Sequence, residues 1–302
     1  MEPKPPAAKT KVTVTIRRGD TGEPIEATSL GPGEVLQAAT DGIEDLGKVV
    51  YPPVGCCIYC PATDDLRREH IIPFGLGGTA VLPAASCSRC ARITGVFEAQ
   101  VLRGPMRAVR VLRRLRSRSK HAGAPGTQRL KVVRSGVTET VEIPIEQYPI
   151  LLHFPTFAPP RFLTGQDGSG IDVTGVASVL FGPPPEEVAR RLGGQSIILE
   201  SEGDRPIAFA RMLAKIVYAM AVAEGAQSRL DGPSPVLSSI LGEIDDIGRW
   251  VGTVTDPIRK YTGLLHRIAI REDLDRGLLL AETQLFADSE TPSYGVILGS
   301  LR

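Results

Sequence analysis

The sequence predicts an α+β fold in which a small cysteine-bearing module is joined to a larger, β-rich domain. All five cysteines of the 302-residue chain lie within 35 residues. The second half contains several short strand-like runs and, among them, one long, alanine-rich helical segment. Because domains usually have ~100–200 residues, the length allows about two of them. We expect a disordered tail at 1–10, a strand and loop region at 11–49, the module at 50–120 and an α+β domain of unassigned role at 121–302.

Composition excludes several protein classes. Apolar residues make up 42% of the chain and charged residues 23%, which is typical of folded domains and excludes a disordered or collagen-like chain. The longest apolar stretch, 208–223, is interrupted by Arg211 and Lys215, so no membrane span is expected. The first residues lack the apolar run of a secretory signal. We therefore expect a cytoplasmic protein with no membrane partner.

Four cysteines have the spacing of a zinc site. Two Cys-x-x-Cys pairs, Cys57/Cys60 and Cys87/Cys90, place four thiolates where tight turns can direct them at one tetrahedral ion. Two disulfides or a redox pair are the alternatives, but the expected cytoplasmic setting keeps thiols reduced. Cys56 could replace Cys57 as a ligand, although Cys57 has the better spacing. We predict a structural Zn²⁺ held by Cys57, Cys60, Cys87 and Cys90.

The segment between the two pairs carries acid–base and metal-binding side chains. Residues 69–73, Glu-His-Ile-Ile-Pro, predict a strand, and strand alternation sends Glu69 and His70 to opposite sides unless the strand ends or bulges between them. Pro73 ends the pairing, and the following glycines provide a loop. An imidazole with a pKa of ~6.5 can deprotonate water at neutral pH. A glutamate is a hard oxygen ligand suited to Mg²⁺ or Mn²⁺.

The order of these motifs carries a specific resemblance. Cys-x-x-Cys, Glu-His-Ile-Ile-Pro, Gly-Gly and a second Cys-x-x-Cys follow one another over about 54–102. This segment resembles the HNH endonuclease family. The resemblance implies a ββα-metal module stabilised by structural zinc, with His70 as general base and Glu69 as a ligand of catalytic Mg²⁺ or Mn²⁺.

The chain departs from the family pattern at two positions. Leu82 stands where the family usually has Asn, and Ala91 stands where it usually has His or Asn. Leucine cannot orient a histidine by hydrogen bonding, and alanine cannot bind a metal. Either other residues take over these roles, with Ser86 or Thr79 orienting His70, or the nuclease is inactive.

The helix expected after Cys90 offers a substitute metal ligand. Ile93, Val96, Phe97 and Val101 recur at helical spacing and predict one buried face. This arrangement turns Glu98 to another face, where it is our candidate for a second metal ligand. The alternative is a solvated helix charge.

A basic stretch follows this helix. From Arg103 to Arg134 the chain has eleven Lys or Arg and no acid, although the whole chain has a formal net charge of only +1. Such a run is usually a solvated face, but beside the expected phosphodiesterase site we predict contacts with the nucleic-acid backbone. The predicted contact residues are Arg107, Arg110, Arg113, Arg114, Arg116, Arg118 and Lys120.

The second half reads as strands around a core helix. Predicted strands lie at 129–134, 137–143, 148–153, 196–200, 264–270, 277–286 and 293–301, a stiff loop at 154–160, a short helix from 182 and a long helix around 209–220. We expect the last three strands to form an antiparallel sheet. His121, His153 and His266 have no partners in the motifs and are expected to be packed or surface residues.

Taken together, the sequence predicts a divalent-metal-dependent endonuclease that hydrolyses DNA phosphodiester bonds. An inactive zinc module that only binds nucleic acid is the first alternative, and an RNA nuclease is the second. Biological pathway, sequence specificity and oligomeric state are not predicted.

Overall fold

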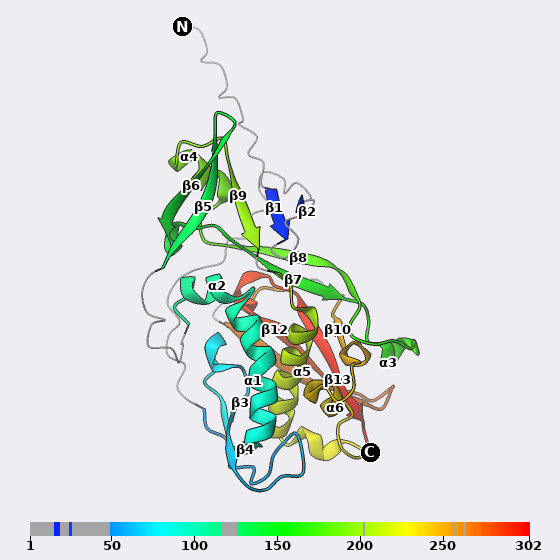
Figure 1. Cartoon of the computed structure of the whole chain (residues 1–302). Coiled ribbons are helices and arrows are strands. Elements are labelled where there is room, and N and C mark those ends of the chain that lie inside the picture. Colours follow the sequence, from blue (N-terminus) through cyan, green and yellow to red (C-terminus); the bar gives the residue numbers. More distant parts are fainter. Residues whose placement is uncertain are drawn as a thin grey trace.

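Helices and mainly antiparallel strands make up the chain, so the predicted α+β class is confirmed (Figure 1). The computed structural model describes residues 15–18, 24–25, 49–115, 126–201, 203–255, 258–261 and 264–302. The expected tail at 1–10 and most of the region 11–49 lie outside these residues. The described helices are α1 Ser88–Arg103, α2 Arg107–Leu112, α3 Arg161–Thr164, α4 Pro185–Arg191, α5 Pro206–Ala223 and α6 Val236–Leu241. The described strands are β1 Thr15–Arg18, β2 Pro24–Ile25, β3 Leu66–His70, β4 Val81–Cys87, β5 Thr127–Arg134, β6 Val137–Pro144, β7 Ile150–Phe157, β8 Val173–Phe181, β9 Ser196–Ser201, β10 Val251–Thr253, β11 His266–Asp273, β12 Leu278–Leu285 and β13 Ser293–Ser300.

The cysteine-bearing module is a β-hairpin followed directly by a helix. β3 and β4 pair antiparallel, with Leu66 opposite Cys87 and His70 opposite Val81. β4 ends at Cys87, and α1 begins at the next residue. The predicted strand at 69–73 lies earlier than expected, because β3 already ends at His70. The hairpin and α1 thus give the ββα order that the sequence predicts.

Helix α1 has a different buried face from the predicted one. Its buried residues are Cys90, Thr94, Phe97 and Val101, whereas Val96 is 56% exposed. Cys90 faces the other three cysteines of the motifs and therefore fixes the rotation of the helix. Positions 94, 97 and 101 follow on the same side at helical spacing. The prediction of a buried Val96 was wrong because it counted apolar residues without this constraint.

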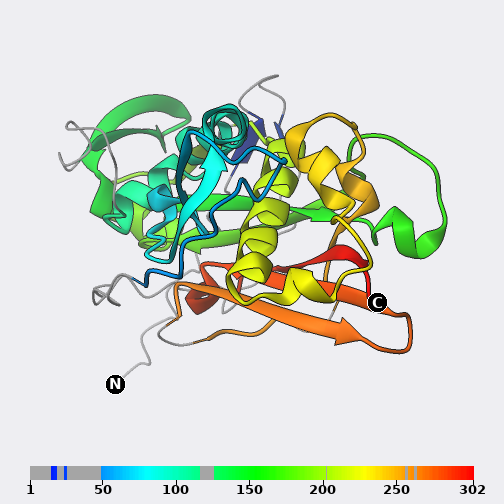
Figure 2. The same ribbon diagram turned by 90° about the horizontal axis from the view of Figure 1, so that it is seen from below.

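Helix α5 is the centre of the core. It lies between α1 with the hairpin on one side and the sheet of β11, β12 and β13 on the other (Figure 2). Within the described part it is long and apolar enough to cross a membrane, but 67% of its span is buried inside the fold. The predicted core helix around 209–220 is confirmed. Its burial extends to Lys215, which has no exposed surface.

The C-terminal strands form the predicted antiparallel sheet. Its strand order is β10-β13-β12-β11, and it packs against α5. A long hairpin of β7 and β8 adds a further layer. The loop predicted at 154–160 was wrong in its first half, because β7 continues to Phe157. A proline within the run suggested a break, but Pro155 lies in a two-stranded sheet, where every strand is an edge.

The hydrophobic core crosses the boundary expected near residue 120. Buried side chains from Cys57 to Leu298 form one contiguous cluster. A second, small cluster joins β5, β6 and β9 to α4, and these elements project together at one end of the molecule (Figure 1). The predicted strands at 129–134, 137–143 and 196–200 belong to this smaller unit. The hairpin module and the C-terminal sheet therefore share a single core around α5.

Two histidines outside the motifs are packed, as predicted. His153 Nδ1 lies 2.8 Å from the Ser178 hydroxyl. His266 Nε2 donates to the Leu76 carbonyl at 2.7 Å, and its Nδ1 accepts the Phe286 N–H at 3.2 Å. His266 thereby ties β11 to the glycine-containing loop that follows β3. The third histidine, His121, lies outside the described residues.

The burial of His266 predicts a pH-dependent stability. Burial lowers the pKa of His266 to about 4, whereas an unfolded histidine titrates near ~6.5. Between these values the unfolded chain binds the additional proton, so the free energy of unfolding falls as the pH drops, by up to ~1.4 kcal/mol per pH unit. Chemical denaturation between pH 7 and 4 measures this slope. His266→Gln keeps a donor for Leu76 but cannot titrate, and a slope equal to that of the wild type would contradict the assignment.

Candidate functional site

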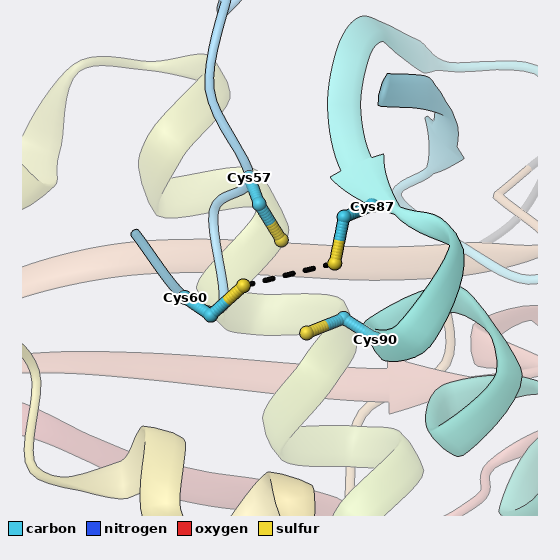
Figure 3. Close-up of side chains that lie close together, drawn as sticks. All are labelled: Cys57, Cys60, Cys87 and Cys90. Carbon is cyan, nitrogen blue, oxygen red and sulfur yellow. Dashed lines mark hydrogen bonds between the residues drawn. The ribbon is translucent and has the colours of Figure 1, made fainter. Parts of the chain in front are cut away.

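The four predicted cysteines converge. The sulfur atoms of Cys57, Cys60, Cys87 and Cys90 all lie within 4.8 Å of one another (Figure 3). Cys60 Sγ and Cys87 Sγ are 3.7 Å apart. Zn–S bonds of ~2.3 Å in a tetrahedron give sulfur separations of about 3.8 Å. Cys56 is exposed and lies outside the group, so Cys57 is the member of that dipeptide in the cluster.

The chemistry of the cluster fits a structural zinc ion. No cystine bond joins the four thiols, which excludes the two-disulfide alternative in this structure. Burial raises the pKa of Cys57 and of Cys90. The backbone N–H of Cys90 donates a hydrogen bond to the sulfur of Cys87 and lowers the pKa of Cys87 to about 7. Zn²⁺ would supply the charge that keeps the four sulfurs deprotonated, three of them on buried cysteines. Its four bonds would join the 57–60 turn to the junction of β4 and α1.

This site predicts one zinc per chain. Cys57→Ser removes a ligand and is expected to lose the metal and much of the thermal stability, because structural zinc binding contributes directly to folding. Cys56→Ser is the matched control and is expected to retain both. Elemental analysis of protein purified without chelator measures the zinc content. Equal zinc in the two variants would contradict the ligand assignment.

His70 lies at the rim of an open hollow. Arg67, Arg68, His70 and Phe74 line this hollow, which has a volume of about 450 Å³. The His70 and Phe74 rings are 5.5 Å apart in an edge-on arrangement. Both arginines are exposed, and Arg67 lies 3.9 Å from exposed Asp65. We call this group of four residues the His70 hollow.

A tight loop follows the strand that carries His70 and connects it to β4. After β3, the chain returns through a short 3-10 helix, Phe74–Leu76, to Gly78. A Cβ atom at Gly78 would lie 2.0 Å from the Ile72 carbonyl oxygen, so only glycine fits there. The Gly-Gly element of the motif therefore has a steric reason. It allows the loop to fold back immediately beside the histidine.

Glu69 points away from His70 into the interior. Strand alternation separates the two side chains as predicted, because the bulge in β3 lies between Arg67 and Glu69, before the pair. Lys215 Nζ is 2.6 Å from Glu69 Oε1 and 3.0 Å from Glu98 Oε1. The two predicted metal ligands are thus brought together from β3 and α1. Both carboxylates face the ammonium of α5.

Lys215 completes this buried charge cluster, and the motifs did not predict it. Its Nζ donates to the His70 carbonyl and lies 3.4 Å from the Ile71 carbonyl. Burial alone would lower the pKa of Lys215, but the charges of Glu69 and Glu98 outweigh it and raise the pKa. The ammonium therefore stays charged. The available signal was a lysine in the middle of a helix whose one other charged residue is Arg211, since a fully buried lysine requires counter-charges.

The ion pairs of Lys215 predict that removing its charge strongly lowers the free energy of unfolding. Lys215→Met leaves two carboxylates without their counter-charge and is expected to lower the free energy of unfolding by ~3–5 kcal/mol. Urea denaturation at pH 7 measures the change. Lys131→Met is the control, because Lys131 pairs with Glu200 on the surface, where such pairs contribute less than ~1 kcal/mol. Equal effects of both substitutions would contradict the buried ion cluster.

Two residues of the basic stretch make contacts inside the fold. Arg110 donates to the carbonyls of Gly75 at 2.6 Å and Leu102 at 2.7 Å. Arg113 is buried, pairs with Asp288 at 2.7 Å and stacks over two phenylalanine rings. The fold provides internal acceptors for these two arginines, and their predicted contacts with nucleic acid stay a prediction. Arg107 and Arg114 are exposed, and Arg116, Arg118 and Lys120 lie outside the described residues.

The positions where the sequence departs from the HNH pattern are also placed. Leu82 is buried and pairs with Glu69 across the hairpin. Ser86 is buried, and its hydroxyl has no hydrogen-bond partner among the described residues, so it does not orient His70 here. Thr79 and Ala91 are half-buried. Among the described residues, the four cysteines are the one group of three or more ligating side chains close enough to share an ion.

Comparison of the chain with protein-family models, with curated proteins and with solved structures finds no match. The resemblance to HNH endonucleases therefore rests on the motif residues themselves and on the hairpin–helix order that carries them.

Proposed function

We propose that the chain is a nucleic-acid-binding protein whose zinc-stabilised hairpin presents the His70 hollow to a phosphodiester backbone. The observation that carries this proposal is the grouping of two exposed guanidinium groups, an imidazole and an aromatic ring around one open hollow. Guanidinium groups pair with phosphate oxygens in a bidentate manner. Aromatic rings offer a stacking surface for an unpaired base.

The interior cluster favours binding over metal-dependent cleavage. The predicted Mg²⁺ or Mn²⁺ ligands, Glu69 and Glu98, both face the Lys215 ammonium. Their donor set does not fit a divalent ion while that ammonium lies between them, because two cations would repel each other at this distance. No hydrolytic step is derived through such a metal. The cysteine-bearing module would then hold the residues that contact the nucleic acid in fixed positions.

Hydrolysis by His70 is the second candidate function. The observation that favours it is the position of His70 on the solvent side of β3, next to Arg67 and Arg68. Two guanidinium groups could hold a phosphate while the imidazole removes a proton from the attacking water. This candidate retains the predicted general base but requires another source of positive charge than a Glu69-bound metal.

If the His70 hollow binds the nucleic-acid backbone, replacing its two arginines is expected to lower the affinity and the salt dependence of binding. Arg67→Ala combined with Arg68→Ala is expected to weaken binding and to reduce the slope of log affinity against log salt by about 2, because two phosphate contacts are lost. Fluorescence anisotropy with single- and double-stranded DNA and RNA measures both quantities. Arg129→Ala, an exposed arginine on β5, is the matched control. An unchanged slope in the double variant would contradict the proposed surface.

A cleavage assay separates the two candidate functions. If the protein only binds, supercoiled plasmid is expected to stay intact with Mg²⁺, Mn²⁺ or no added metal, while the anisotropy signal persists. If His70 is a general base, nicked plasmid forms and His70→Ala abolishes it. Plasmid nicking by the wild type and not by His70→Ala would replace the binding proposal by the hydrolytic one.

A further inference from the structure

The Lys215 ammonium lies in a pocket of oxygen atoms built from separate parts of the chain. Glu69 Oε1 and the carbonyl oxygens of His70 and Ile71 come from β3 and the residue after it, and Glu98 Oε1 comes from α1. Carboxylate and carbonyl oxygens are the ligands that hard divalent cations prefer. The oxygen set would therefore suit a metal ion as well as an ammonium.

The Tyr59 side chain is a further buried polar group. The Tyr59 hydroxyl is buried and has no hydrogen-bond partner among the described residues. Burial, and after it the charges of Glu69 and Glu98, raise its pKa well above the ordinary value. Glu98 Oε1 pairs with the ammonium at 3.0 Å and has no further hydrogen-bond partner among the described residues. A buried hydroxyl without a partner, such as that of Tyr59, is rare and needs an explanation.

The charges of the cluster do not balance. Two carboxylates with a formal charge of −2 face a single ammonium of +1; Lys215 is fully buried, and the Glu98 side chain is 20% exposed. A divalent ion in place of the ammonium would neutralise both carboxylates. The single ammonium therefore neutralises one of the two carboxylate charges.

We propose that Lys215 occupies an interior cation site that would otherwise hold a divalent metal ion between Glu69 and Glu98. In the natural chain the protein's own side chain is the cation, and the site is closed to Mg²⁺ and Mn²⁺. Shortening this side chain opens the site. The inference does not depend on nucleic-acid binding, because it concerns the interior side of β3 and is tested without nucleic acid.

The test is a Mn²⁺ titration of the zinc-loaded, full-length protein. Lys215→Ala and Lys215→Asn are compared with the wild type by the loss of the free Mn²⁺ signal in electron paramagnetic resonance and by thermal unfolding. Each variant is expected to bind one more Mn²⁺ than the wild type. At a Mn²⁺ concentration 100-fold above the dissociation constant, its melting temperature is expected to rise by roughly 5 °C. Adding Glu69→Gln to either variant is expected to abolish both effects.

Three outcomes would overturn the proposal. The first is that both variants titrate like the wild type. The second is that the wild type itself binds one Mn²⁺ that Glu69→Gln removes, because Lys215 would then not close the site. The third is that neither variant folds at any Mn²⁺ concentration, because a metal that replaces the ammonium should restore the charge balance. Folding that requires Mn²⁺ would support the proposal, since the ion would then take over the role of Lys215.

Discussion

The ammonium of Lys215 connects the three elements around which the rest of the chain is arranged. It contacts Glu69 on β3, Glu98 on α1 and the backbone after His70, while its own helix α5 forms the centre of the core. In a medium of low dielectric such contacts are strong when every partner is present and costly when one is removed. The position of β3, and with it the presentation of His70 on the opposite face, is therefore coupled to a helix more than a hundred residues further along the chain.

Features that depend on neighbouring residues could be predicted from the sequence. The spacing of the two Cys-x-x-Cys pairs identified the four clustered sulfurs, and strand alternation placed Glu69 and His70 on opposite sides. Alternating apolar runs also located most strands of the C-terminal sheet. The DNA and RNA preferences, the reaction and the partners remain predictions, because they depend on ligands rather than on the chain alone.

Features that depend on distant residues could not be predicted in this way. Lys215 is 145 residues from His70, and Arg113 is 176 residues from Ser289. In the sequence, Arg113 belongs to an acid-free basic run, and nothing nearby reveals that Asp288 will neutralise it. The rotation of α1 was missed for a related reason, since Cys90 is constrained by sulfurs outside the helix. Local charge density alone therefore does not separate arginines with internal acceptors from exposed ones.

The continuous core has a consequence for how the hairpin module could be inherited. Residues of the module pack against α5, and α5 packs against strands at the C-terminal end, without an intervening interface of the kind that separates autonomous domains. A zinc-stabilised hairpin of this size could move from one protein to another only if its apolar residues packed against each other within the module. Here the module and its surroundings have to change together, and recombination at its ends would expose hydrophobic surface on both fragments.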